Sequence, residues 1–337
     1  MHQMPPMLPP FHWGSFLRVW EFRPGWDAFA LLLLAGYVAG LVVCRRHGVR
    51  SVHPVRVLMF VLGVALLVLT VSSAVDAYAM ALFWDHMVEH LLLIMVVPAL
   101  LVLGHPLTVL RAAASTRGRA GTVDGVLRSG PVAVLTHPVF AVALYSVVIV
   151  ATHLTSFMDV MATHHWVMAG EQVLYLASGY LFLLPLLGNE PIRWRLPYLL
   201  RIALLLGAMT PDTVVGIVLM QTVSDIFPVM MAGHPAWALS PVDDLHMAGG
   251  IMWAGGDGLM MFMAVGVVIA LIASGDEKVA LGSWLQGVRR TTLADAVARG
   301  DATGATFDDE ADVDEDDAML AAYNRMLARL DRENPRG

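Results

Sequence analysis

The sequence predicts an all-α integral membrane protein with seven transmembrane helices, its N-terminus outside the cell and its C-terminus in the cytoplasm. Hydrophobic residues make up 57% of the 337 positions, and charged residues only 15%. A soluble domain carries about 25% charged residues. Seven apolar stretches approach the roughly 20 residues that a bilayer-spanning helix needs. Each stretch should be a helix, because a helix satisfies its own backbone hydrogen bonds in lipid.

The apolar stretches set the order of the predicted elements, and polar or basic loops separate them. A segment of residues 1–25 precedes the first stretch and is rich in proline, without the apolar core of a signal peptide. We therefore expect the first span to direct membrane insertion. The predicted spans are Trp26–Cys44, Val55–Val75, His86–Gly104, Val132–His153, Val167–Leu187, Leu199–Gln221 and His246–Ala273.

Basic residues predict the orientation of these spans. Arginines occur in the first, third and fifth loops, whereas the second, fourth and sixth loops contain neither Arg nor Lys. By the positive-inside rule the odd loops are cytoplasmic, although Arg18 and Arg23 lie on the opposite side. The loop arginines are Arg45, Arg46, Arg50, Arg56, Arg111, Arg117, Arg119, Arg128, Arg193 and Arg195.

The chain divides into an extracytoplasmic segment (1–25), a seven-helix domain (26–275) and a cytoplasmic tail (276–337). The net charge of −7 belongs to the tail, where 308–317 forms an acidic, solvated run. Residues 319–332 have apolar positions at helical spacing, which predicts a short amphipathic helix that either docks on a cytoplasmic surface or has no partner. A near-neutral body argues against nucleic acid as a partner.

Residue counts exclude two further classes of site. Cys44 is the only cysteine, so neither an intramolecular disulfide nor a CxxC metal site can form. Lys278 is the only lysine and lies beyond the last span, which excludes a retinal-type Schiff base within the helices.

Histidines gather at the predicted outer ends of several helices. His86 and His90 are four residues apart, so they project from one helix face and can share a metal ion. Taken alone, such a pair at a helix end is more often a polar anchor at the interface. His153 and His246 end and begin other spans at the same side. We expect Asp85 and Glu89 to hold the free ring N–H groups of His86 and His90.

Acidic residues also occur within the spans. Glu171 lies near the outer end of the fifth span, and Asp212 and Asp257 lie near the middle of the sixth and seventh. His246 and Asp257 fall on one helical stripe. Buried carboxylates of this kind usually pair or line an ion path, so we expect these to orient ligands or carry protons. The alternative is that they are protonated and only bridge neighbouring helices.

Methionines suggest which metal the histidines bind. Many of the 21 methionines lie near the same outer half. Thioethers with imidazoles suit Cu(I), whereas methionine is also an ordinary gap-filling residue. The candidate additional soft ligands are Met87, Met168, Met220 and Met247. Zinc is the alternative metal, because residues 86–90 match the H-x-x-E-H pattern of a zinc hydrolase. Ligation of a haem by two of these histidines is a further alternative.

Several stretches together resemble one known family, the multi-span CtaG family of cytochrome c oxidase assembly factors. The resemblance covers five helices and the tail, whose end is similar to that of actinobacterial members, some of them fused to a CopD-like copper-resistance domain. This family is distinct from the single-span periplasmic copper chaperone of the same name. The stretches that carry the resemblance are residues 86–95, 97–104, 136–138, 171–177, 249–253 and 320–328.

The resemblance implies a protein of the bacterial plasma membrane that helps to assemble a haem-copper oxidase by handling copper. The positions that match the family are His86, Glu89, His90, His153 and Glu171. Two positions depart from it, since many relatives have His where this chain has Gln172, and Gln is more common where it has His246.

From the residues and the resemblance together, we expect a non-catalytic chaperone that holds Cu(I) on His86, His90, His153 and His246 and delivers it to an oxidase subunit. A zinc-dependent membrane hydrolase and a copper permease are the alternatives.

Overall fold

The computed structural model describes residues 8–11, 14, 19–49, 52–231 and 233–274, together with five single positions in the tail, 291, 320, 321, 323 and 324. The chain divides into two compact units, Met1–Val267 and Val268–Gly337, and the description below concerns the first. The predicted tail helix (319–332) and acidic run lie outside the described residues, apart from those single positions. The predicted N-terminal segment is described only in part.

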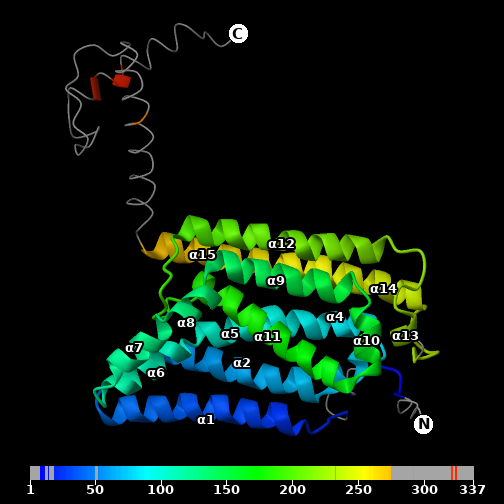
Figure 1. Ribbon diagram of the computed structural model, residues 1–337, viewed down its shortest axis with the longest axis horizontal. Helices are drawn as coiled ribbons and strands as arrows, with labels where there is room; N and C mark the ends of the chain where they lie inside the picture. Colours follow the sequence, from blue (N-terminus) through cyan, green and yellow to red (C-terminus); the bar gives the residue numbers. More distant parts are fainter. Residues whose placement is uncertain are drawn as a thin grey trace. The chain divides into compact units, whose positions relative to one another are not determined.

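Every regular element in the described ranges is helical, as the sequence predicts (Figure 1). The helices are α1 (Pro24–Arg46), α2 (Pro54–Ser72), α3 (Ala74–Ala79), α4 (Phe83–Leu91), η2 (Leu92–Val96), α5 (Val97–Leu103), α6 (Pro106–Ser115), α7 (Ala120–Leu127), α8 (Gly130–Leu135), α9 (Pro138–His153), α10 (Phe157–Thr163), α11 (His165–Leu187), α12 (Tyr198–Met220), α13 (Pro228–Met231), α14 (Pro241–Gly250), η3 (Ile251–Gly255) and α15 (Gly256–Ser274). The two η segments are π-helical turns.

Six of these helices or helix runs in the described part are long and apolar enough to cross a bilayer. A seventh span forms if α9 and α10, which meet at an angle of 71°, are counted together. The predicted fourth span, which began at Val132, is wrong at its start. Pro138 cannot continue the preceding helix, and His137 is extended and accepts a hydrogen bond from the backbone N–H of Val139.

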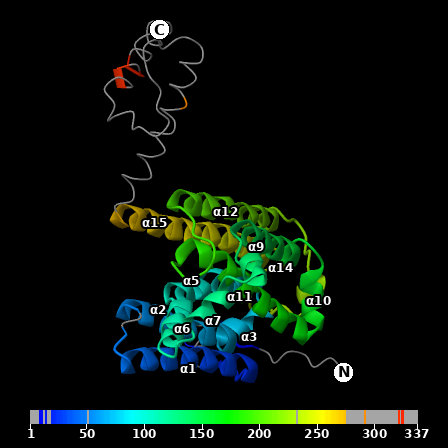
Figure 2. The same cartoon turned by 60° about the vertical axis from the view of Figure 1, so that its left-hand side comes forward.

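The run α4–η2–α5 lies at the centre of the bundle. It packs against α2, α11 and α14. In Phe83–Ser115, the longer helix run that contains it, 67% of the most apolar stretch is buried, compared with 17% in α1. Figures 1 and 2 both place α1 at one edge and α12 at the opposite edge. The residues that the centre of the bundle holds are therefore shielded from lipid as well as from water.

Close backbone contacts at glycines set the packing around this central run. A Cβ atom on Gly179 of α11 would lie 1.9 Å from the carbonyl oxygen of Ile94 in η2. A Cβ atom on Gly216 of α12 would lie 2.8 Å from the carbonyl oxygen of Gly249 in α14. Small residues of this kind let membrane helices approach closely. Gly179 allows α11 to approach the helix run that carries His86 and His90, and Gly216 allows α12 to approach α14.

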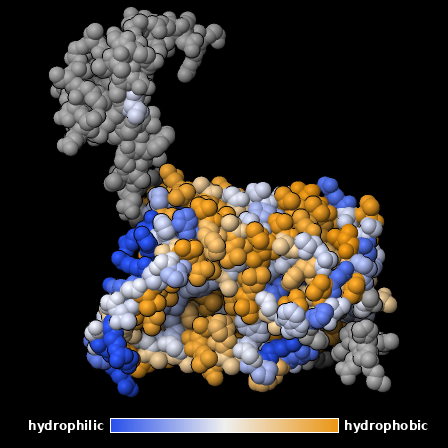
Figure 3. Space-filling model, viewed as in Figure 1, coloured by the Kyte–Doolittle hydropathy of each residue, from blue (hydrophilic) through white to orange (hydrophobic). Residues whose placement is uncertain are grey.

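The two ends of the bundle differ in composition. We call the end that carries α10 and α13 the histidine end, and the end that carries α6, α7 and α8 the arginine end (right and left in Figure 1). Between them the visible face is largely hydrophobic, while hydrophilic residues gather toward the ends (Figure 3). This pattern fits a bilayer-spanning body; which end faces the cytoplasm stays a prediction.

Candidate metal centre

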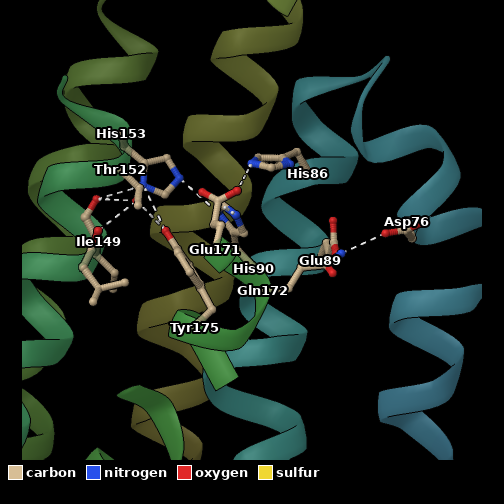
Figure 4. A network of polar contacts seen from close by, with 11 residues as sticks. Asp76, His86, Glu89, His90, Ile149, Thr152, His153, Glu171, Gln172 and Tyr175 are labelled. Atoms are coloured by element: carbon tan, nitrogen blue, oxygen red, sulfur yellow. Dashed lines mark hydrogen bonds and ion pairs between the residues drawn. The ribbon is translucent and has the colours of Figure 1, made fainter. Parts of the chain in front are cut away.

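Three fully buried side chains meet near the histidine end: His86 and His90 of α4 and Glu171 of α11 (Figure 4). Their exposed fractions are 1%, 4% and 3%. His86 Nε2 lies 3.8 Å from Glu171 Oε2, and His90 Nε2 lies 3.4 Å from Glu171 Oε1. One donor atom from each residue lies within 4.8 Å of the others, and within the described ranges this is the one set of three that could hold a metal ion.

The helix that presents the two histidines is anchored at its N-terminus. The backbone N–H groups of Phe83 and Trp84 donate to the Asp244 carboxylate at 2.8 and 3.0 Å. Asp244 also faces His234 Nε2 at 3.1 Å. The first N–H groups of a helix lack partners within the helix, so this carboxylate from α14 fixes the start of α4.

His153, at the end of α9, fixes the orientation of His90. The distance from His153 Nδ1 to the carbonyl oxygen of Ile149 is 2.9 Å. Because a carbonyl oxygen only accepts, Nδ1 of His153 carries the proton and its Nε2 has a lone pair. His90 Nδ1 lies 3.2 Å from that Nε2, so His90 donates through Nδ1. The lone pair on His90 Nε2 therefore faces Glu171.

Aromatic and hydroxyl groups complete this side of the centre. The Tyr175 ring stacks on the His90 ring, with centroids 3.9 Å apart. Its hydroxyl forms a hydrogen bond of 2.6 Å with the Thr152 hydroxyl. Tyr175 follows Glu171 by one helical turn, so α11 supplies both the carboxylate and the ring that holds His90 in place.

The hydrogen-bonding groups of the centre are not satisfied within the described residues. Both ring nitrogens of His86 and Oε1 of Glu171 are buried without a hydrogen-bond partner. A buried polar group left unpaired costs about 1–3 kcal/mol. A single proton on Glu171 can bridge to one histidine only, whereas a metal ion can bind both Nε2 atoms and the carboxylate together.

On the other side of α4, a glutamine joins two acids. Gln172 Nε2 donates to Glu89 Oε1 at 2.6 Å and to Asp76 Oδ1 at 2.8 Å. Gln172 Oε1 accepts from Trp26 Nε1 at 2.9 Å. Asp76 also contacts Arg23. Burial raises the pKa of Asp76, and the positive charge of Arg23 opposes that shift.

The predicted roles of the acids on α4 differ from what the structure shows. Glu89 hydrogen-bonds to Gln172 rather than to an imidazole, and one carboxylate oxygen of Asp85 is buried without a partner. Glu171, which we expected to act behind the ligands, instead lies directly against both histidines. The difference arises because α11 packs against η2 and α5, the continuation of α4, and this packing brings Glu171 to His86 and His90, which spacing along α4 cannot reveal.

The remaining predicted residues lie outside this group of three. His246 Nε2 is 2.7 Å from the carbonyl oxygen of Thr222. Asp212 accepts from the Tyr145 hydroxyl at 2.7 Å, and Asp257 from the Thr213 hydroxyl at 2.7 Å. The π-turn η3 lies between His246 and Asp257, so the continuous stripe predicted for them is interrupted.

The predicted thioether ligands divide by burial. Met87 and Met168 are buried on α4 and α11, the helices that carry the three central residues, whereas Met220 is half-buried and Met247 is 44% exposed. Met168 precedes Glu171 by three residues and so shares its helix face. Of the predicted methionines, Met168 is therefore best placed in the helix register.

Sequence reasoning missed Gln172, Trp26, Asp76 and Tyr175 as parts of this network. Gln172 stood out only as a departure from a family pattern. Asp76 follows an apolar span, and its distance along the chain from the histidines does not indicate that it lies near them. These residues come from α1, α3 and α11, and only the packing of the helices brings them together.

Comparison with known proteins identifies the family. Residues 35–274 match the Caa3_CtaG family, described as cytochrome c oxidase caa3 assembly factors. Uncharacterized proteins of Mycobacterium bovis and Mycobacterium tuberculosis are each 32% identical over 324 residues, which cover 94% of this chain and 45% of theirs. A Mycobacterium leprae protein is 33% identical over 326 residues, with the same coverage.

The chain thus spans less than half the length of these curated relatives. No solved structure matches the chain. The family match covers all the residues of the centre and confirms the resemblance drawn from the motifs, so that this chain belongs to the Caa3_CtaG family of cytochrome c oxidase caa3 assembly factors.

Proposed function

We propose that this protein is a non-enzymatic copper chaperone of the bacterial plasma membrane, which holds one copper ion on His86, His90 and Glu171 for insertion into a haem-copper oxidase. His153 fixes the tautomer of His90 behind the site. The assembly role rests on the family; the copper role rests on the centre itself. Oxidase subunits in the bilayer are the partners to which the ion is delivered.

The observation that carries the proposal is the arrangement of lone pairs. His90 Nε2 and Glu171 Oε1 face each other at 3.4 Å, and neither ring nitrogen of His86 has a hydrogen-bond partner in the described part of the chain. Nitrogen ligands bind metal ions such as zinc at about 2.0–2.1 Å, so ligands of one ion lie roughly 3–4 Å apart. Small side-chain rotations bring the three donors to that separation.

Charge favours a monovalent ion. Two neutral imidazoles and one ionised carboxylate carry a single negative charge, which Cu(I) cancels and a divalent ion reverses. An uncompensated charge at a site this buried costs several kcal/mol. Imidazole suits copper, and the thioether of Met168 is a soft ligand that prefers Cu(I) over zinc.

Metal loading tests the copper role. Purified protein, loaded anaerobically with Cu(I) and desalted, should retain about one ion per chain. The double variant His86→Ala/His90→Ala should retain none, while His164→Ala, which removes an exposed histidine near the same end, should retain the ion. Retention by the double variant, with its helical content intact, would contradict the proposed site.

An inventory of the oxidase tests the assembly role. In a strain that lacks this protein, we expect the terminal oxidase to contain haem but to be deficient in copper. Complementation with the wild-type gene should restore copper, and complementation with Glu171→Gln should not. A fully assembled, copper-replete oxidase in the deletion strain would overturn the assembly role.

A zinc-dependent hydrolase is the second candidate, because two histidines and a glutamate are also the ligands of many catalytic zinc sites. In the H-x-x-E-H pattern the glutamate is the general base. Here Glu89 hydrogen-bonds to Gln172, which disfavours that role. Zinc that co-purifies in stoichiometric amounts, with hydrolysis lost in Glu89→Ala, would support the hydrolase instead.

Copper that crosses the membrane of sealed vesicles containing only this protein would support a permease.

A further inference from the structure

A long apolar groove runs beside α1, and none of His86, His90 and Glu171 lines it. Its volume is 1210 Å³, and its walls come mainly from α1, α6 and α11. On α1 the lining extends from Arg23 and Gly25 to Val43. A helix rises 1.5 Å per residue, so the groove is about 27 Å long, close to the roughly 30 Å hydrocarbon core of a bilayer.

The size of the groove restricts its occupant. Its volume exceeds the roughly 300–1,000 Å³ of pockets that hold ordinary small molecules. The groove also extends over about the length of the hydrocarbon core, and its lining is mostly apolar. Flexible hydrocarbon chains suit a space of this length and chemistry.

A glycine on α1 leaves space in the groove that a larger side chain would fill. Gly36 lines the groove, and a Cβ atom built on it would meet no heavy atom within 4 Å. A larger side chain at this position would extend into the groove without disturbing the packing of α1. The position therefore offers a way to fill the groove selectively.

The chemistry at the arginine end favours an anionic head group. Arg117 lines the groove there and is exposed, and the ion pairs found among the described residues do not include it. By contrast, Arg23 at the opposite end is paired with Asp76 and Glu21. Basic pockets between transmembrane helices bind the head groups of anionic lipids.

We propose that this groove binds an anionic phospholipid, with its phosphate on Arg117 and its acyl chains along the Gly36 face of α1. Charge places the head group at Arg117, because among the described residues the ion pairs of acidic side chains include Arg23 but not Arg117. The groove volume accommodates the chains. None of His86, His90 and Glu171 lines the groove, although Met168 does. Arg117 and Gly36 lie outside the helices that carry those three residues, so variants at these two positions test lipid binding separately from copper binding.

Photo-crosslinking identifies the occupant. A photoreactive phenylalanine analogue at position 36 of the full chain, irradiated in bacterial membranes, should form an adduct with the mass of a phospholipid. The same analogue at position 207, an exposed α12 glycine that does not line the groove and also has no heavy atom near its Cβ position, gives the background. A polypeptide adduct at position 36, or none above that background, would overturn the proposal.

Binding measurements test the head-group assignment. Delipidated protein in detergent is titrated with phosphatidylglycerol or with phosphatidylcholine, and bound lipid is counted by native mass spectrometry. One arginine near an anionic lipid should give a preference of about five-fold for phosphatidylglycerol. Arg117→Gln should remove the preference for phosphatidylglycerol. If the variant preferred phosphatidylglycerol as strongly as the wild type does, the assignment of the head group to Arg117 would be wrong.

Two glycine-to-leucine variants test where the acyl chains of the lipid lie. Gly36→Leu should reduce the bound phospholipid to the background level, while Gly207→Leu should leave it unchanged. Both substitutions replace an exposed helical glycine by the same strong helix former, so a general effect on stability would appear in both. Full binding by Gly36→Leu would contradict a site in the groove.

Discussion

Two clusters of histidine and carboxylate side chains lie against α4, one at the start of the helix and one around His86 and His90. They differ in how many of their polar atoms have a hydrogen-bond partner. At the start of the helix, His234 and the carboxylate of Asp244 lie 3.1 Å apart, and that carboxylate also accepts from two backbone N–H groups. Within the described residues no buried atom of this pair lacks a partner.

One turn further along, His86, His90 and Glu171 are equally buried, but three of their polar atoms have no hydrogen-bond partner. Buried polar groups in folded proteins are nearly always paired, so this difference supports the proposal that the second site binds a metal ion while the first is structural. Burial and residue type alone would not have distinguished them.

The largest effect on stability is expected at the satisfied site. Asp244→Ala would leave two helix N–H groups and His234 buried without their partner, and removal of one member of a buried pair costs about 3–5 kcal/mol. Chemical unfolding in detergent measures the loss, with Asp243→Ala, an exposed neighbour, as the control. If the two variants were equally stable, Asp244 would not anchor α4.

At the site of His86, His90 and Glu171 we expect a small effect on stability and a large effect on copper affinity. Glu171→Gln removes a carboxylate that has an unpaired oxygen, so the stability of the metal-free protein should change by less than about 1 kcal/mol. Affinity for Cu(I) should fall by at least about 100-fold, since even residues behind the ligands contribute 10–100-fold. Competition with a Cu(I) chelator measures the affinity. Unchanged affinity would exclude Glu171 as a ligand.

A smaller effect on the metal is expected from the residue that orients His90. His153→Phe keeps a ring in place but removes the Nε2 acceptor for His90 Nδ1, so His90 can present the wrong tautomer. Affinity for Cu(I) should fall by about 10–100-fold, less than in Glu171→Gln. A loss as large as that of Glu171→Gln would make His153 a ligand itself.

The sequence predicted the spans well because apolar runs of bilayer length allow few alternatives. It also singled out His86, His90 and Glu171, which the structure brings together. It could not assign their roles, because the contact of Glu171 with both histidines depends on the packing of α11 against η2, which Gly179 permits.

His246 shows the same limit. Its position near the histidine end suggested a fourth ligand, yet its ring faces the carbonyl oxygen of Thr222. Helical periodicity also fails across η2 and η3, because a π-turn shifts the register of every residue that follows. Rotation about the helix axis, unlike span length, is decided by tertiary packing.

The mildest substitution separates the two sites most cleanly. His234→Gln removes the ring that faces Asp244 but keeps a hydrogen-bond donor, and the two N–H groups of α4 retain their carboxylate. Stability should fall by about 1 kcal/mol, the net value of one hydrogen bond, and affinity for Cu(I) should stay within two-fold of the wild type, roughly 0.4 kcal/mol. Unfolding and chelator competition on the same preparation measure both. A large loss of copper affinity would show that the anchor of α4 and the metal centre are coupled, because a shift of the helix start would then move His86 and His90.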